Sequence, residues 1–238
     1  MVENLSRQGV ETGCIRVDDE AATGLALILV DQAGQNSIVT AAGANGRVGI
    51  GDLDRVEAVL REAKLLLLQF EVPMEAVAHV IELAAELPIK VVLNPAPAWP
   101  VSPELLAQVD YLVPNETEAT ALTGVEVVDL ATAEAAAQEL LGCGVGAAII
   151  TLGGQGALLA TKEGSFHVPA VAVPVVDTTA AGDAFIGGLG TGLVRGFPLE
   201  EAVRYATCAG TLAVTVFGAQ TSLPDEAQVQ ALYEAGAL

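Results

Sequence analysis

The segment best equipped for chemistry is 176–185, which reads VDTTAAGDAF. An apolar run ends at Val176, and a turn of small residues leads into a helix predicted over 181–195. The side chains of Ala180, Ala181 and Gly182 are too small to cover the backbone N–H groups at the positive end of this helix. Such amides can hold a phosphate group while negative charge builds up during phosphoryl transfer.

Asp183 stands in the first turn of the same predicted helix. A carboxylate beside a phosphate cradle can take the proton from an attacking hydroxyl group, which is the role of a general base. The residue types also fit a simpler interpretation. An acidic residue is favourable in the first turn of any helix, and a glycine there can serve only the turn.

Three further segments, which follow one another along the chain, each carry asparagine, glutamate or glycine. They read NPAPA at 94–98, PNETEA at 114–119 and TLGGQG at 151–156, and VFGAQ follows at 216–220. Together with DTTAAGDAF they resemble the PfkB carbohydrate kinases, and the AAGD form is most similar to the ribokinase branch of that family. The resemblance runs from about Leu5 to the end of the chain.

The resemblance implies a catalytic centre for sugar phosphorylation. Asp183 is implied to be the base that deprotonates the sugar hydroxyl and to contact the sugar, and Ala180, Ala181 and Gly182 are implied to form the anion hole. Glu71 matches a residue that binds sugar hydroxyls. A solvated glutamate at the end of a strand remains the alternative for Glu71.

The resemblance also implies a nucleotide site for ATP. Asn115 is implied to lie near the phosphates, and Thr207 at the adenine side. The segment 151–156 lacks GxGxxG spacing and precedes an apolar strand, so it is not a dinucleotide-binding fingerprint. A glycine turn without a ligand is the alternative. The implied nucleotide contacts in the glycine-rich loop and the anion hole are Thr151, Leu152, Gly153, Gly154, Gln155, Gly156 and Gly182.

Two metal sites follow from the same resemblance. Glu118 is implied to organise Mg²⁺ through water, although Asn115 and Glu118 also have the spacing of a helix capping box, and both roles can hold together. A monovalent cation, K⁺, is implied as an activator. Its implied site is formed by Asp177, Thr179, Ala213, Val216, Gly218 and Ser222.

Composition limits the possible partners. The chain has 238 residues, 52% of them hydrophobic and 17% charged, and a formal net charge of −20. This hydrophobicity excludes intrinsic disorder, and the negative charge argues against binding to nucleic acid or an anionic membrane. No Walker A lysine is present, so a bound phosphate needs amides or a metal ion. The scattered cysteines and the lack of an apolar leader predict a cytoplasmic protein.

The elements that must position these residues alternate between strands and helices. This alternation predicts an α/β fold, a doubly wound, mostly parallel sheet in a three-layer sandwich, with ligands at the carboxyl ends of the strands. We expect one domain over 1–238, with a partial β lid at about 23–42 that turns at 31–34. The strands are predicted at 25–30, 37–41, 65–68, 91–93, 111–113, 147–151, 157–161 and 166–173. The helices are predicted at 53–63, 73–87, 103–109, 116–122, 131–142, 181–195, 199–216 and 226–235.

The sequence departs from the family at its beginning. The early Asp-x-Asn sugar contact and the GGKGAN motif of the family have no counterpart, so about a quarter of a family domain is expected to be missing. We expect ATP-dependent phosphorylation of the primary hydroxyl of a sugar, D-ribose to ribose 5-phosphate, and a homodimer through the lid. The alternatives are a non-catalytic nucleotide-binding remnant, or a kinase for fructose, a nucleoside or a keto-deoxy sugar acid.

Overall fold

The computed structural model describes residues 2–30 and 36–236 and contains two sheets. Six strands form the main sheet in the order in which they occur in the chain, from β3 to β8, and a separate two-stranded sheet pairs β1 with β2. The strands are β1 (Leu25–Val30), β2 (Asn36–Ala41), β3 (Leu65–Leu68), β4 (Lys90–Leu93), β5 (Tyr111–Leu112), β6 (Ala147–Thr151), β7 (Ala157–Thr161) and β8 (Gly164–Val168).

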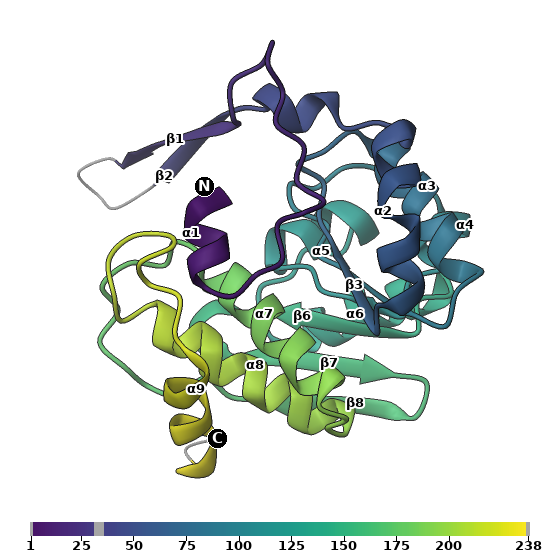
Figure 1. Cartoon of the computed structure of the whole chain (residues 1–238). Helices are drawn as coiled ribbons and strands as arrows, with labels where there is room; N and C mark the ends of the chain where they lie inside the picture. The colour runs from purple at the N-terminus through teal and green to yellow at the C-terminus, as the bar shows by residue number, and fades with distance from the viewer. Residues whose placement is uncertain (1, 31–35, 237–238) are drawn as a thin grey trace.

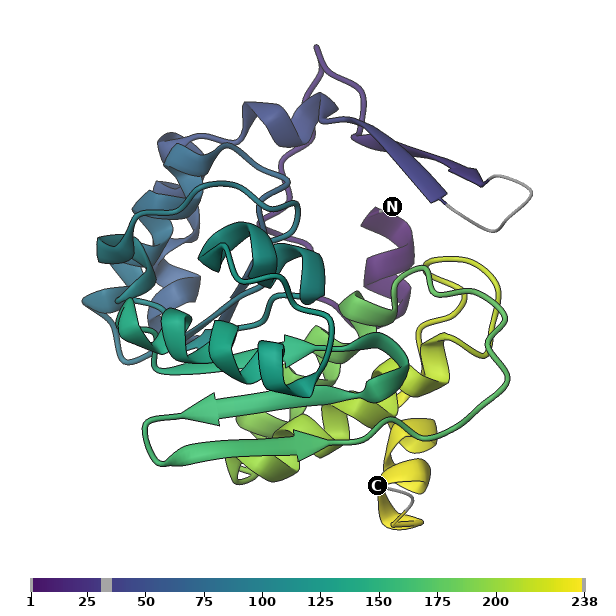
Figure 2. The same cartoon turned by 180° about the vertical axis from the view of Figure 1, so that it is seen from behind.

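Helices cover both faces of the main sheet (Figures 1 and 2). One core lies between the sheet and helices that include α3, α5 and α6, and a second core lies between the other face and α7 and α8. The predicted three-layer α/β architecture is thus confirmed. The helices are α1 (Val2–Arg7), α2 (Ile50–Glu62), α3 (Met74–Ala85), α4 (Pro103–Leu106), α5 (Glu116–Thr123), α6 (Leu130–Gly142), α7 (Ala181–Val194), α8 (Leu199–Ala213) and α9 (Glu226–Glu234).

The main sheet is parallel where it carries the candidate site. β3, β4, β5 and β6 run parallel to one another, and β7 and β8 extend the sheet by antiparallel pairing. Buried strands of this kind need apolar residues on both faces. Val92, Leu93, Leu112, Ile149 and Ile150 have no exposed side-chain surface, as that rule requires.

Two glycines let α7 approach α8 closely. A Cβ atom on Gly188 would lie 2.9 Å from Ala206 Cα, and one on Gly192 would lie 3.0 Å from Ala202 Cα. Real Cβ atoms do not tolerate the shorter of these distances, so this helix pair depends on glycine at the contact. The close packing fixes α7, and with it the position of the segment that precedes it.

The β1–β2 ribbon stands away from the main sheet (Figure 1). Its register pairs Leu25 with Ala41 and Leu27 with Val39, which places these four side chains on one face. Leu25 is 68% exposed, Leu27 55% and Val39 59%. The strands were predicted correctly, but the turn predicted at 31–34 lies outside the described residues.

Four predicted elements have an end that was wrong by three residues or more. The strand predicted at 166–173 runs from Gly164 to Val168, because Pro169 and Pro174 offer no N–H group for a continued ladder. The helix predicted at 53–63 begins at Ile50, the helix predicted at 103–109 ends at Leu106, and the helix predicted at 199–216 ends at Ala213. These errors lie at element ends and leave the layers unchanged.

Candidate active site

Candidate residues follow four neighbouring parallel strands at the same end of the sheet. Glu71 comes after β3, Asn94 after β4, Asn115 after β5, and the loop 151–156 begins at the last residue of β6. Because these strands are parallel, their carboxyl ends meet along one edge, which is where α/β sheets bind ligands. The helix α7 begins on the side toward which β6 points (Figures 1 and 2).

Asn115 and the glycine-rich loop lie next to each other. A short parallel bridge pairs Asn115 with Thr151, and the Thr151 N–H donates to the Pro114 carbonyl at 2.9 Å. A Cβ atom on Gly153 would lie 3.7 Å from Glu116 Oε1. The structure therefore brings the loop 151–156 against the start of α5.

The loop itself is a tight turn with an exposed tip. The Leu152 N–H donates to the Gly156 carbonyl at 2.8 Å, and Gly153–Gln155 form one turn of 3₁₀ helix. Gly153, Gly154 and Gln155 are exposed, whereas Leu152 and Gly156 are buried and can offer a ligand only backbone groups. Gly156 has a φ of +95°, and a Cβ atom there would lie 2.0 Å from the Val168 carbonyl, so only glycine fits.

Glu118 is a buried carboxylate with one occupied oxygen. Glu118 is only 7% exposed. Its Oε2 accepts hydrogen bonds from the Asn115 N–H at 2.8 Å and from Asn94 Nδ2 at 3.5 Å. The Asn115 side chain in turn caps α5 through the Glu118 N–H at 2.8 Å. Burial raises the pKa of the Glu118 carboxyl, and the two hydrogen bonds oppose that rise. The capping box uses Oε2 and leaves Oε1 without a hydrogen bond from the described residues, so it does not exclude a role in the site.

The start of α7 presents free amides. Ala180 has a φ of +60°, the one positive value at a non-glycine residue of the described chain. The Ala181 N–H donates to the Thr178 carbonyl at 3.3 Å, whereas those of Ala180, Gly182 and Asp183 have no acceptor among the described residues. A Cβ atom on Gly182 would meet no atom within 4 Å. The amides thus face open space at the positive end of a 14-residue helix.

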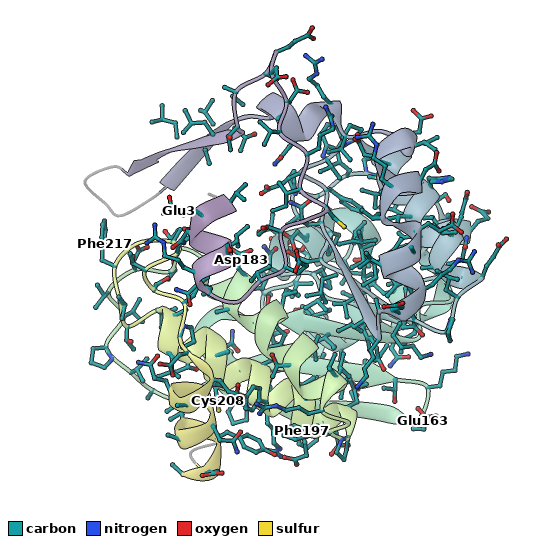
Figure 3. The ribbon with its side chains drawn as sticks, in the orientation of Figure 1. Glu3, Glu163, Asp183, Phe197, Cys208 and Phe217 are labelled. Carbon is teal, nitrogen blue, oxygen red and sulfur yellow. The ribbon has the colours of Figure 1, made fainter. Side chains whose placement is uncertain are left out.

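Asp183 is exposed at this helix start and makes no hydrogen bond to the described residues through its side chain. Figure 3 shows it at one end of α7, with Phe197 beyond the other end. A carboxylate that is free of protein partners can accept a proton from a bound hydroxyl group. The helix start therefore combines an unblocked acid with unblocked amides.

Asp177 joins the segment before α7 to the loop after α8. Its carboxylate oxygens accept from the Thr179 N–H and the Gly218 N–H, both at 2.9 Å, and these bonds lower its pKa. The Asp177 N–H donates to the Val214 carbonyl at 3.3 Å. Ser222 is buried, and its hydroxyl donates to the Ala219 carbonyl at 2.7 Å. Carboxylate, carbonyl and hydroxyl oxygens of this kind suit a hard cation.

Two sequence-derived site residues lie apart from these contacts. Thr207 is buried within α8, and its hydroxyl donates to the Val203 carbonyl at 2.9 Å, so its side chain presents nothing to a ligand. Glu71 is exposed after β3, where its N–H donates to Gln69 Oε1 at 2.6 Å. Its carboxylate has no described protein partner, which leaves it available to solvent or a ligand.

The two basic side chains without an ion-pair partner among the described residues lie away from the carboxyl edge of the sheet. Of the ten Lys and Arg residues, all of them in the described part, eight are ion-paired with acidic residues, which leaves Lys64 and Lys162. Lys64 precedes β3, and Lys162 follows β7, which runs antiparallel to β6. Both therefore lie at the amino end of the sheet, and neither is placed to neutralise a phosphate at the carboxyl edge.

The metal-binding potential of the site is modest. Within residues 2–30 and 36–236, no three His, Cys, Asp or Glu side chains gather as a metal cage. This donor set fits Mg²⁺ that keeps most of its water and is held largely by a nucleotide's phosphates, and the free oxygen of Glu118 could accept hydrogen bonds from that water. It does not fit a metal held by a cage of His, Cys, Asp and Glu side chains.

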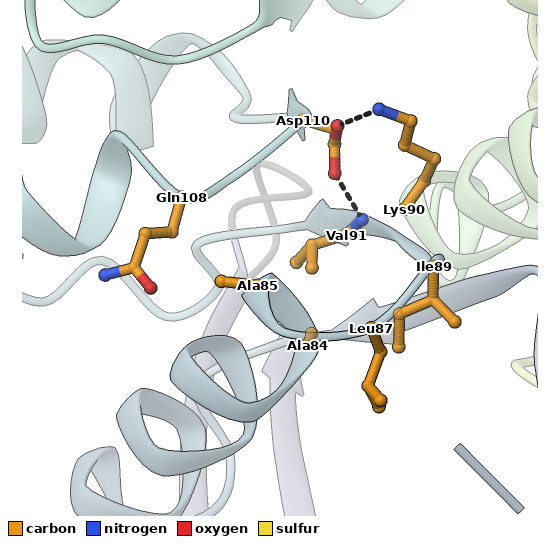
Figure 4. Close-up of a pocket in the computed structure, with 8 residues that line it drawn as sticks. All are labelled: Ala84, Ala85, Leu87, Ile89, Lys90, Val91, Gln108 and Asp110. Carbon is orange, nitrogen blue, oxygen red and sulfur yellow. Dashed lines mark hydrogen bonds and ion pairs between the residues drawn. The ribbon is translucent and has the colours of Figure 1, made fainter. Parts of the chain in front are cut away.

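The pocket drawn in Figure 4 lies at the other end of the sheet. Lys90 Nζ and the Val91 N–H donate to the two oxygens of Asp110 at 2.7 and 2.8 Å. The rest of its wall is formed by Ala84 and Ala85 of α3, by Leu87 and Ile89 in the segment that follows, and by Gln108. With its only carboxylate occupied and no connection to the carboxyl edge, this pocket plays no part in the candidate site. No helix of the described chain is long and apolar enough to span a membrane.

Sequence reasoning missed two residues that shape the site. Asn94 was part of a motif, but its bond to Glu118 was not foreseen. His167 on β8 donates from Nε2 to the Gln155 carbonyl at 2.7 Å and so holds the glycine-rich loop. A polar residue directly after a buried parallel strand was the available signal for Asn94. No local signal pointed to His167, because its partner lies 12 residues away.

Comparisons with known proteins agree with this geometry. The family model for pfkB family carbohydrate kinase matches residues 1–226. A ribokinase of Haemophilus influenzae is 39% identical over 224 residues, which cover 94% of this chain and 73% of that protein. A deoxyribokinase of Salmonella typhi is 38% identical over 224 residues, with the same coverage.

The structure of Arabidopsis thaliana ribokinase complexed with ribose and ATP is 32% identical and superimposes with a TM-score of 0.85. The match covers 95% of this chain and 74% of that one. The family model spans nearly the whole chain, and the fold and the order of its motifs agree with it. The chain therefore belongs to the pfkB family of carbohydrate kinases, and the protein is a sugar kinase, a phosphotransferase.

Proposed function

We propose that this protein transfers the γ-phosphoryl group of ATP to the primary hydroxyl of D-ribose, giving ribose 5-phosphate. The observation that carries the proposal is the start of α7, where the free N–H groups of Gly182 and Asp183 adjoin the unpartnered Asp183 carboxylate. The Haemophilus and Arabidopsis relatives are both ribokinases, and the Arabidopsis structure holds ribose and ATP. These relatives support ribose as acceptor and ATP as donor.

In this proposal each group at the carboxyl edge has one task. Asp183 accepts the proton of the sugar hydroxyl as its oxygen attacks phosphorus. The anion hole of the Ala180–Gly182 turn stabilises the charge on the transferred group, through the free amides of Ala180 and Gly182 and that of the adjoining Asp183, while the Ala181 N–H holds the turn by its bond to Thr178. Asn115 and the exposed tip of the loop 151–156 hold the remaining phosphates and the nucleotide. Glu71 binds a sugar hydroxyl. Thr207 can contribute only through the shape of α8.

Two cations complete the proposal. Mg²⁺, bound with the nucleotide, would neutralise phosphate charge that Lys64 and Lys162 do not reach, and the free oxygen of Glu118 would accept hydrogen bonds from its water. K⁺ would lie beside Asp177, close to the turn that bears the amides. The oxygen groups of Thr179, Ala213, Val216, Gly218 and Ser222 are its other proposed ligands.

The β1–β2 ribbon is the proposed lid over the sugar. Two strands with no third neighbour are marginally stable, and the ribbon exposes apolar side chains on one face. We propose that residues 1–238 act as one domain with this partial lid, and that lids of two copies pair in a homodimer. A cytoplasmic location is part of the proposal, since ATP is its donor.

A second acceptor has specific support. The Salmonella relative is a deoxyribokinase, and its 38% identity is close to the 39% of the Haemophilus ribokinase. Deoxyribose lacks the 2-hydroxyl, so a site with an unpaired polar group opposite C2 discriminates strongly against it. Fructose, a nucleoside or a keto-deoxy sugar acid are further acceptors to test. A non-catalytic nucleotide-binding remnant is the alternative of a different class.

The test is a product assay with purified protein, ATP, Mg²⁺ and K⁺. Ribose, deoxyribose, fructose, a nucleoside and a keto-deoxy sugar acid are offered separately, ADP release is recorded, and ³¹P NMR identifies the phosphorylated carbon. The proposal predicts ribose 5-phosphate as the preferred product. Preference for another sugar would overturn the acceptor, and ATP binding by calorimetry without transfer to any sugar would support the remnant.

A further inference from the structure

We propose that Asn94 is a positioning residue that holds the Glu118 carboxylate in the orientation needed to face the metal–nucleotide complex. The inference rests on the proposed function in one respect, namely that Glu118 faces the water shell of Mg²⁺. It adds a residue from a neighbouring strand whose side chain does not itself meet metal or substrate. The proposal is based on the position of the Asn94 side-chain amide, which lies between the end of β5 and the start of α5.

The backbone around Asn94 fixes where its side chain starts. Asn94 directly follows β4, and its N–H donates to the Leu68 carbonyl of β3 at 2.9 Å. Its carbonyl accepts from the Ala96 N–H at 2.8 Å. Asn94 is thus tied to two segments of the carboxyl edge before its side chain makes any contact.

The Asn94 side chain is held from the opposite side as well. Its Nδ2 donates to the Val113 carbonyl at 2.8 Å, just past the end of β5. The second hydrogen of the same amide group reaches Glu118 Oε2, with a nitrogen–oxygen distance of 3.5 Å. An amide group has two hydrogens on one plane, so the strong bond to Val113 aims the other toward Glu118.

Both protein donors to the Glu118 carboxylate meet the same oxygen. The Asn115 N–H and Asn94 Nδ2 point to Oε2, and Oε1 accepts no hydrogen bond from the described residues. No buried side-chain oxygen of the described part lacks a partner, so Oε1 reaches solvent. One bond alone would let the carboxylate rotate about the bonded oxygen, whereas two donors on Oε2 fix which oxygen faces outward.

The chemistry explains why asparagine suits this position. Aspartate has nearly the same shape but donates no hydrogen bond, so Asn94→Asp would lose the bonds to Val113 and Glu118 and place a second negative charge beside a buried carboxylate. Alanine would remove the donors without adding charge. Loss of a group that orients a metal-facing side chain typically weakens metal affinity about 10- to 100-fold.

The experiment measures Mn²⁺ bound in the presence of ADP by EPR for the wild type, Asn94→Asp and Asn94→Ala. Thr123→Ala is the matched control, since Thr123 donates to the Ala119 carbonyl on the same helix but does not touch Glu118. We expect roughly 10-fold weaker Mn²⁺ binding in Asn94→Ala and a larger loss in Asn94→Asp. Metal-free ADP affinity should stay at the wild-type value, and Thr123→Ala should bind Mn²⁺ as the wild type does.

Wild-type Mn²⁺ affinity in both Asn94 variants would overturn the proposal. An equal loss in Thr123→Ala would also overturn it, by showing that the effect comes from loosening of α5. Failure of the wild type to bind Mn²⁺ with ADP would remove its premise. If the Asn94 effect is seen but no sugar is phosphorylated, only the proposed function fails, and the positioning role stands.

Discussion

The carboxyl edge of the sheet and the β1–β2 ribbon are built in opposite ways. At the edge, Glu118 is 7% exposed and fixed by two donors, and the glycine-rich loop is tied to β8 through His167. On the ribbon, Leu25, Leu27 and Val39 are each more than half exposed, and the strands pair only with each other. The edge is therefore organised before any ligand binds. The apolar side chains of the ribbon, by contrast, can be buried only when a ligand or another copy of the chain packs against them.

The difference predicts separate consequences for mutations in the two regions. Substitutions at the edge should change catalysis or nucleotide binding, and some should also cost stability. Substitutions on the ribbon should leave the fold intact and act only on sugar binding or association. The variants below, from the largest expected effect to the smallest, test whether the two regions respond in these separate ways.

Asp183→Asn should cause the largest loss. Removal of the general base lowers the rate of phosphoryl transfer about 10²- to 10⁴-fold, while ATP affinity by calorimetry stays unchanged. Glu200→Gln is the matched control, because Glu200 is an exposed acid in the first turn of α8. If both variants lose activity equally, or neither does, Asp183 acts only as an acidic residue at a helix start.

Gly156→Ala should cost both stability and nucleotide affinity. The added Cβ would lie 2.0 Å from the Val168 carbonyl at a φ of +95°, so the loop must move. We expect a loss of about 2–4 kcal/mol in the free energy of unfolding, measured with urea, and a raised KM for ATP. Gly154→Ala, where a Cβ meets nothing within 4 Å, should lose less than about 1 kcal/mol. Equal losses would contradict the predicted role of the close contact.

Glu118→Gln should separate stability from function. Burial raises the pKa of this carboxyl. The folded protein therefore binds more protons than the unfolded chain between the unfolded and folded pKa values, and the free energy of unfolding falls as pH rises through that window. Glutamine removes this dependence, so the metal-free variant should have a higher Tm than the wild type at pH 8 and a similar Tm in acid.

The same substitution should weaken activity at limiting Mg²⁺, since a neutral amide orders the water around a cation less well than a carboxylate does. The two readouts are the Tm as a function of pH and the Mg²⁺ concentration at half-maximal rate. A lower Tm at pH 8 would contradict the stability argument by showing that the ionised carboxylate stabilises the fold. An unchanged Mg²⁺ dependence would show that Glu118 serves only to cap α5.

Leu27→Ser on the ribbon should have the smallest effect on the fold. An exposed side chain contributes little to stability, so the free energy of unfolding should stay within about 0.5 kcal/mol of the wild type. Sedimentation should show a shift toward the monomer if the exposed face pairs two copies. A large loss of stability would mean that the ribbon packs on the body of its own chain.

The layers, and the edge of the sheet at which the candidate residues lie, could be predicted because they depend on local patterns. Apolar runs of four to five residues, such as 65–68 and 147–151, gave the parallel strands, and their carboxyl ends gave the position of Glu71, Asn115 and the glycine-rich loop. The α7 start was also visible, since small residues before a helix leave amides uncovered. These features can be recognised from residues that are adjacent in the sequence.

What could not be predicted depends on contacts between distant segments. Glu118 accepts a hydrogen bond from Asn94, 24 residues earlier, and the loop 151–156 is held by His167 from another strand. The family resemblance implied Thr207 at the adenine side, but its hydroxyl is turned into α8. The β8 strand ends early because Pro169 follows Val168 directly, a breaker that the apolar pattern of 166–173 outweighed in the prediction.

The most direct measurement is a crystal structure with ribose and the Mg²⁺ complex of an ATP analogue whose γ-phosphate cannot transfer. The account predicts a terminal phosphate within hydrogen-bond distance, about 3 Å, of the Gly182 and Asp183 N–H groups, with the Asp183 carboxylate against the sugar's primary hydroxyl. A phosphate bound elsewhere, leaving those amides to water, or an Asp183 side chain turned away from the sugar would contradict it.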